Sequence, residues 1–281
     1  MVKIFIDSAS DITEKEAKEL GIGFLPIEVR FGEEEYLDGV DITAETFYDK
    51  LESSNTFPKT SQINPFRFEE CFAKETSDGS EVVMITMSSK ISGTYQSALE
   101  GAKNFKDKVF VVDSLNACTG ERLLGLYALK LANEGKSGKE IKEELDKAKL
   151  NIKLFAVIDT LEYLKKGGRI SATSAMIGSM LSIKPIIGVV GGEIKVLAKA
   201  MGTKKSYMML NSTIEKGGEI DYSMPVGFIY SGKDLTPLQN YKTTIPNILN
   251  QANNEIPAYP LGCTIGAHIG SGAVGLAYFK K

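Results

Sequence analysis

The sequence has few of the residues that catalytic and metal sites most often use. Its 281 residues include one histidine, three cysteines and no tryptophan. A structural zinc site needs two close pairs of cysteine or histidine ligands, which His268 and the scattered Cys71, Cys118 and Cys263 do not supply. The odd number of cysteines also argues against a disulfide framework and favours a reducing compartment. We therefore expect neither a metal nor a cofactor.

Long apolar segments and clusters of basic residues are missing as well. The formal net charge is −3 and there is no long run of lysine and arginine, which argues against nucleic-acid binding. The longest uncharged stretch in the middle of the chain, residues 170–183, is shorter than the roughly 20 residues that cross a bilayer. At the N-terminus, Asp7 interrupts any apolar signal segment. These features predict a cytoplasmic protein without stable membrane insertion, and we expect a monomer.

Apolar runs of strand length alternate with helical patterns in the first half of the chain, which is typical of βαβ units and a parallel sheet. Residues 136–149 are dense in lysine and glutamate and lead to a predicted boundary near residue 152. The chain is also longer than most single domains. We therefore predict two α/β domains: residues 1–152, with a mainly parallel sheet and flanking helices, and residues 153–281, with a mixed sheet.

Caps and hydrophobic periodicity place the individual elements. Strands are predicted at residues 3–6, 82–87, 109–112, 155–158, 193–197, 226–230, 264–267 and 274–279. Helices are predicted at residues 11–21, from Pro65 onward, and at residues 94–105, 122–133, 138–150, 203–215 and 238–253, the last interrupted by Pro246. An Asp-Ser or Asp-Thr pair follows three of the strands, at Asp7, Asp113 and Asp159. Such pairs serve either as helix caps or as polar groups at the sheet edge where ligands bind.

One glycine motif suggests a nucleotide site that the rest of the sequence contradicts. Residues 270–275 match G-x-G-x-x-G, but a dinucleotide site needs a helix after the glycines and an acidic residue about 20 positions later. The given sequence stops at Lys281, so neither feature is present. These glycines are better interpreted as a tight turn or as a place where the backbone approaches a ligand.

Two polar loops are candidates for binding an anion. Thr60-Ser61-Gln62 is predicted to lie in a loop between Pro58 and Pro65. Ser92-Gly93-Thr94 follows a predicted strand and opens a helix, where backbone N–H groups and a serine hydroxyl can face an anion. Because these donors are neutral and basic residues are few, a compact, singly charged carboxylate fits better than a phosphate.

Several motifs together resemble those of the DegV family. They are Asp7-Ser8 with Asp11, the Thr60 and Ser92 loops, Asp113-Ser114, residues 164–170 (LKKGGRI), residues 184–186 (KPI) and residues 266–275 (GAHIGSGAVG). The resemblance spans essentially the whole chain. It implies two α/β domains with one fatty acid in a tunnel between them. The ligand-binding residues that it implies are Thr60, Ser61, Ser92, Gly93, Thr94, Arg169, His268 and Gly270.

The apolar residues at 170–183 could line this tunnel or form a buried core helix. Roughly 14 buried methylenes at about 0.8 kcal/mol each would contribute on the order of 11 kcal/mol, so apolar contact must supply most of the affinity. The hydroxyl groups would then fix the orientation of the carboxylate.

The resemblance leaves three functional hypotheses. The first is a fatty acid carrier that presents the carboxylate to a partner kinase, as in bacterial fatty acid kinase. Met201 stands where relatives that serve the kinase carry an arginine, so we expect weak or absent coupling. The second is a hydrolase or acyltransferase that uses Ser92 and His268 with Asp7 or Asp113, although no G-x-S-x-G motif is present. The third is a lipid storage or sensing protein without a kinase.

Overall fold

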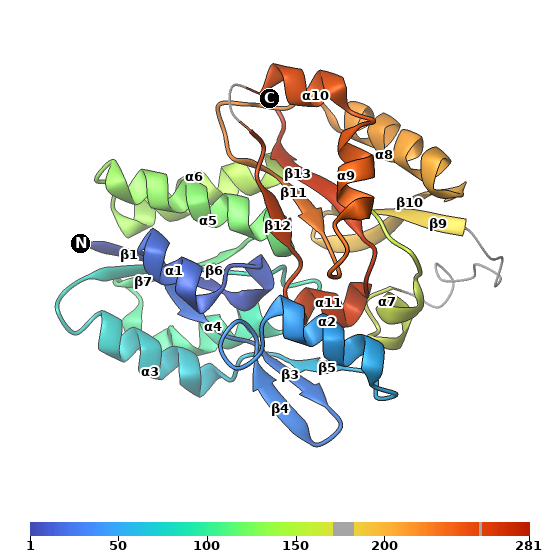
Figure 1. Cartoon of the computed structure of the whole chain (residues 1–281). Coiled ribbons are helices and arrows are strands. Elements are labelled where there is room, and N and C mark those ends of the chain that lie inside the picture. The colour runs from blue at the N-terminus through green and yellow to red at the C-terminus, as the bar shows by residue number, and fades with distance from the viewer. Residues whose placement is uncertain (171–182, 253–254) are drawn as a thin grey trace.

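Figure 1 shows a computed structural model of the chain, which describes residues 1–170, 183–252 and 255–281. The strands of these ranges form a four-stranded parallel sheet, a three-stranded antiparallel sheet and a six-stranded mixed sheet. The parallel sheet comes from the first half of the chain and the mixed sheet from the second half, so the predicted α/β class is confirmed.

The parallel sheet has the order β2-β1-β6-β7, with strands Gly23–Leu25, Val2–Asp7, Glu81–Thr86 and Val109–Asp113. Helices α5 (Cys118–Asn133) and α6 (Gly138–Ala148) cover one face, and α3 (Pro65–Glu75) and α4 (Thr94–Gly101) cover the other. Because both faces are covered, residues 82–85 of β6 and 109–112 of β7 form unbroken apolar runs instead of alternating with polar residues.

Local capping signals account for several helix ends. Asn64 caps α3 with Pro65 as its first residue, and Ser137 caps α6 in a capping box, both as the sequence suggests. The first helix is corrected: α1 spans Glu14–Leu20 and is capped by Thr13, while Asp11 lies before it in the left-handed conformation. Helix α4 is shorter than predicted and is followed by a 3₁₀ turn, Lys103–Phe105.

The three-stranded sheet was not predicted from the sequence. Its order is β4-β3-β5, with strands Glu34–Leu37, Glu28–Phe31 and Lys59–Ser61, and helix α2 (Ala44–Ser53) lies between β4 and β5 in the chain. The Thr60 segment is therefore an edge strand and not the loop we expected. Three-residue strands with exposed polar side chains lack the alternation that marks a strand in a sequence.

The mixed sheet has the order β10-β9-β8-β13-β11-β12. Its strands are Glu193–Met201, Ile183–Val190, Ile152–Val157, Val274–Phe279, Val226–Tyr230 and Ala258–Pro260. Helices α8 (Thr203–Gly217) and α9 (Thr236–Lys242) pack on one face. The other face turns toward α5 and the parallel sheet, so α5 contacts both sheets (Figure 1).

One predicted strand is a helix. Residues 264–267 belong to α11, Cys263–Ile269, and not to a strand. The Asp38 carboxylate accepts the backbone N–H groups of Cys263 and Thr264 at 3.1 and 2.9 Å, and Asp11 accepts that of Gly262 at 2.7 Å. These carboxylates satisfy the free donors at the helix start and override a strand-like pattern of apolar residues.

The remaining helices are short. They are the 3₁₀ turns Ser8–Ser10 and Lys149–Asn151, and the helices α7 (Glu162–Lys166) and α10 (Pro246–Gln251). The predicted break at Pro246 is confirmed, because α9 ends before it and α10 begins on it. In the described ranges, no helix has both the length and the apolar character needed to cross a membrane.

Candidate functional site

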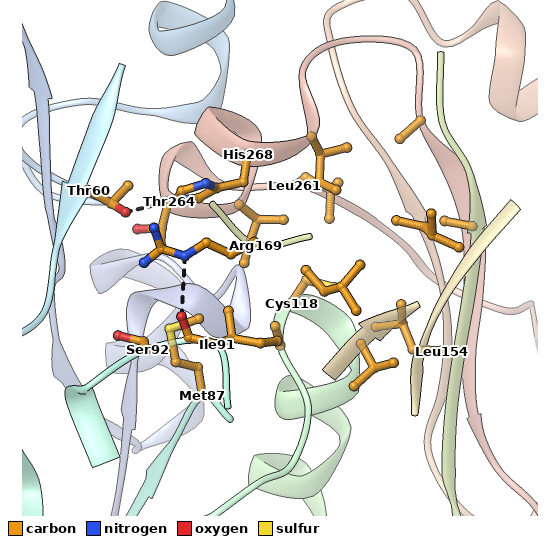
Figure 2. A pocket seen from close by; sticks show the side chains of 18 of the residues that line it. Thr60, Met87, Ile91, Ser92, Cys118, Leu154, Arg169, Leu261, Thr264 and His268 are labelled. Carbon is orange, nitrogen blue, oxygen red and sulfur yellow. Dashed lines mark hydrogen bonds between the residues drawn. The ribbon is translucent and has the colours of Figure 1, made fainter. Parts of the chain in front are cut away.

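A cavity lies between the inner face of the mixed sheet and the loops that follow the strands of the parallel sheet (Figure 2). About 810 Å³ of space that no atom fills lies within it, part of which is open to solvent. Most of the lining is apolar, and polar side chains gather at one end. Such a cavity suits an elongated apolar molecule with a single polar end.

Strand alternation explains the apolar floor. Leu154, Ala156 and Ile158 come from every second position of the β8 segment and therefore face the cavity together. Ile187 of β9 lies directly across from Ala156 in the sheet register. The intervening Phe155 and Val157 point to the opposite face and pack beneath α8. The wall opposite the sheet includes Met87 and Ile91, which follow β6, and Ala117 and Cys118 at the start of α5.

The polar end brings together segments that are far apart in the sequence. Thr60 and Ser61 come from β5, Ser92 from the turn before α4, Arg169 from the segment after α7, and His268 from α11. Figure 2 shows Thr60, Ser92, Arg169 and His268 at the same end of the cavity, away from Leu154. The structure thus brings these five predicted site residues to one cavity.

Thr60 and His268 form a hydrogen bond of 2.9 Å between Thr60 Oγ1 and His268 Nε2. A Cβ atom on Gly167 would lie 2.1 Å from His268 Nδ1, so only glycine leaves room for the ring in this position. Burial, and secondarily the charge of Arg169, lower the pKa of His268 to about 4. The imidazole is therefore neutral at pH 7 and has a single N–H group to donate.

This pKa predicts a pH-dependent contribution of His268 to stability. The unfolded chain binds the proton near pH 6.5 and the folded chain only near pH 4, so the free energy of unfolding falls as the pH falls through this window. We expect His268 to account for a loss of about 2 kcal/mol between pH 7 and pH 5. Urea unfolding of the ligand-free wild-type protein and of His268→Gln at both pH values measures the contribution of His268 to this loss. Equal losses in the two proteins would contradict the prediction.

Arg169 places a half-buried positive charge beside His268. Its Nε donates to the Ile91 carbonyl oxygen at 3.3 Å and its Nη1 donates to that of Gly167 at 2.6 Å. Burial lowers its pKa, and among the described residues no carboxylate forms an ion pair with it. A guanidinium that has lost water without gaining a counter-ion favours an anionic ligand.

Three of the predicted site residues support the cavity without lining it. A Cβ on Gly93 would lie 1.8 Å from Gln62 Oε1, so this glycine lets the Thr60 segment pack against α4, where Gln62 also donates to Ser97 at 3.0 Å. Thr94 is buried and its hydroxyl bonds that of Ser92 at 2.9 Å. Gly270 ends α11 with a positive φ and packs on Tyr163, and it does not line the cavity.

Sequence reasoning named Gln62 only as part of the Thr60 segment, and it missed Thr264 and much of the apolar wall. Thr264 lay in a segment assigned to a strand, and nothing local distinguished Ala156 or Ile187 from ordinary core residues. The uncharged stretch proposed as tunnel lining falls almost entirely on residues 171–182, outside the described residues.

The geometry does not assemble a Ser–His catalytic pair among the described residues. His268 Nε2 bonds Thr60, while the Ser92 hydroxyl bonds Thr94. The carboxylates of Asp7 and Asp113 accept backbone N–H groups of the segments that follow β1, β6 and β7, and neither forms a hydrogen bond with the imidazole. Across the described ranges, no three metal-ligating side chains cluster either.

Comparisons with known proteins agree with this geometry. The family model described as an uncharacterised protein of the DegV family matches residues 1–281. A DegV domain-containing protein of Clostridium acetobutylicum is 35% identical over 281 residues, covering 100% of this chain and 99% of the relative. A fatty acid-binding DegV family protein of Thermus thermophilus superimposes with a TM-score of 0.88 at 27% identity, covering 100% of this chain and 99% of its own. DegV of Bacillus subtilis, a fatty acid-binding protein, superimposes with a TM-score of 0.82 at 26% identity over 100% and 99% of the two chains.

Proposed function

The chain belongs to the DegV family, and from this membership and the cavity we propose that it binds one long-chain fatty acid with the carboxylate at the polar end. The observation that carries the proposal is the cavity itself, an apolar space with one end formed by hydroxyls and a guanidinium. The Thermus thermophilus and Bacillus subtilis proteins, which share the fold over their whole length, are fatty acid-binding proteins.

The proposed roles at the polar end follow from the donors available. A neutral His268 that donates from Nε2 to Thr60 Oγ1 leaves the Thr60 proton free for the ligand carboxylate. The opposite tautomer would make Thr60 the donor to His268 and remove that proton from the site. We therefore assign the proton to Nε2. Ser61 and Ser92 contribute further hydroxyls, and Arg169 supplies the balancing positive charge.

The same groups support a binding protein more than an enzyme. A hydrolase needs a base within hydrogen-bond reach of its nucleophile, and the bonding of Ser92 to Thr94 and of His268 to Thr60 leaves these two groups unpaired with each other. Presentation of the carboxylate to a kinase is a further part of the proposal. We expect phosphate transfer from a kinase to be weak, because Met201 stands where relatives that serve the kinase carry an arginine. Met201 lies at the end of β10 and is 60% exposed.

Native mass spectrometry of the protein purified from a heterologous host tests the proposed function. We expect a mass above that of the bare chain by one common fatty acid, since burial of a long acyl chain at about 0.8 kcal/mol per methylene slows its release. Denaturing extraction should then recover the free acid. A bare mass together with no uptake of added palmitate or oleate would refute the proposal.

A further inference from the structure

The cavity contains a hydroxyl group that the proposed site does not yet use. Thr264 lines the cavity, is 3% exposed, and its Oγ1 has no hydrogen-bond partner in the described part of the chain. Several other buried side-chain atoms lack partners, but of those described only Thr264 Oγ1 and His268 Nδ1 belong to residues that line the cavity. An unpaired hydroxyl in the wall of a cavity is available to bond a ligand that enters the cavity.

The position of Thr264 in α11 explains why the protein itself offers no partner. Elsewhere in the chain, Thr213 and Thr76 bond the carbonyl oxygens of Met209 and Phe72, four residues earlier in their helices. Thr264 is in the first turn of α11, where the residue four positions earlier is Pro260 of β12. No helical carbonyl precedes it, so its hydroxyl is left without this local bond.

The backbone of Thr264 is held firmly while its side chain is unpaired. The Asp38 carboxylate accepts its N–H at 2.9 Å, and the neighbouring Gly266 packs so closely on α2 that a Cβ would lie 2.7 Å from Phe47. Threonine also has a restricted χ1. Because Thr264 and His268 are four residues apart in one helix, they share a face with their Cβ atoms about 5–6 Å apart. Figure 2 shows both at the polar end, near Thr60 and Arg169.

We propose that Thr264 is an additional ligand-binding residue, whose hydroxyl donates a hydrogen bond to an oxygen of the bound lipid's polar end. The inference rests on the proposed function. It makes the polar end a set of donors, namely the hydroxyls of Thr60, Ser61, Ser92 and Thr264 and the guanidinium of Arg169. A carboxylate has only acceptors and matches such a set, whereas the hydroxyl of a fatty alcohol has a single oxygen and a proton of its own. Thr264 thus contributes to selection of the acid.

The chain offers a closely matched control. Thr119 is also the second residue of a helix, α5, is fully buried and has an unpaired Oγ1, but it does not line the cavity. Thr264→Val and Thr119→Val therefore make the same chemical change in the same structural setting, and only the first removes a group from the cavity.

The test is competition against a fluorescent fatty acid, with delipidated protein and with palmitate or hexadecanol as competitors. We expect Thr264→Val to weaken palmitate binding roughly 10- to 100-fold and to weaken hexadecanol binding much less. Thr264→Ser, which keeps the hydroxyl, should bind palmitate to within about threefold of wild type. Thr119→Val should bind as wild type does. Thr264→Ala repeats the test if the valine variant does not fold.

Two outcomes would overturn the inference. Palmitate affinity of Thr264→Val and Thr264→Ala within twofold of wild type would show that the hydroxyl makes no bond to the ligand. An equal loss of palmitate affinity in Thr119→Val would show that the effect comes from replacing a buried hydroxyl by a methyl group and not from removing a group from the cavity. A wild-type protein that takes up no fatty acid would instead refute the proposed function, and the inference with it.

Discussion

Replacing Thr60 by valine and Ser92 by alanine in one chain should weaken the binding of a long-chain fatty acid by about 100-fold or more. Each hydroxyl is expected to donate to the carboxylate, and a hydrogen bond to a charged group contributes about 1.5–3 kcal/mol. Two such losses amount to about 3–6 kcal/mol, or roughly 10²- to 10⁴-fold in Kd. The neutral valine and alanine leave the apolar wall intact, so the acyl chain still binds.

The ligand and a conservative variant provide the controls for this experiment. The matching fatty alcohol, which is uncharged, should lose less affinity than the acid. The variant Thr60→Ser with Ser92→Thr keeps both hydroxyls and should stay within a few-fold of wild type. Titration of the delipidated proteins with acid and alcohol measures all of these affinities. Equal losses for acid and alcohol would show that the two hydroxyls do not bind the head group.

A larger side chain in the floor of the cavity should weaken the binding of long-chain fatty acids by a comparable factor, while short-chain acids still bind. Ala156 faces the cavity from β8, with Ile187 across from it on β9. On its other side, β13 presents Gly275, where even a Cβ atom would lie 2.8 Å from that of Ala156. A larger side chain at position 156 therefore has room only toward the cavity.

We expect Ala156→Phe to weaken palmitate binding by about 100-fold, because a phenyl ring displaces several methylenes worth about 0.8 kcal/mol each. Ala156→Val should give a smaller loss, and both variants should bind decanoate nearly as well as wild type does. Binding measured over a series of chain lengths checks this, with thermal unfolding to confirm the fold. A uniform loss at every chain length would mean that residue 156 does not contact the acyl chain.

The sequence alone determined the class of the fold and the polar segments of the site. Apolar runs identified β1, β6 and β7 of the parallel sheet, and two of these runs, in β1 and β7, end in Asp-Ser pairs. Burial on both faces of a sheet requires such continuous apolar residues. The capping residues before α3 and α6 act through hydrogen bonds within a few positions, so their signal is local. The Thr60 and Ser92 segments also stood out, because each concentrates small polar residues within a few positions.

Tertiary structure decided how these segments come together to form a site. Thr60 and His268 are 208 residues apart, and their bond depends on the absence of a side chain at Gly167. The segment at residues 264–267 is strand-like in isolation, yet it becomes helix α11 because Asp11 and Asp38, more than 200 residues earlier, accept its first N–H groups. The orientation of Thr264 and the exposure of Ala156 to the cavity depend on the same long-range packing. Sequence patterns report interactions between neighbours in the chain, whereas the cavity is formed by residues that only folding brings together.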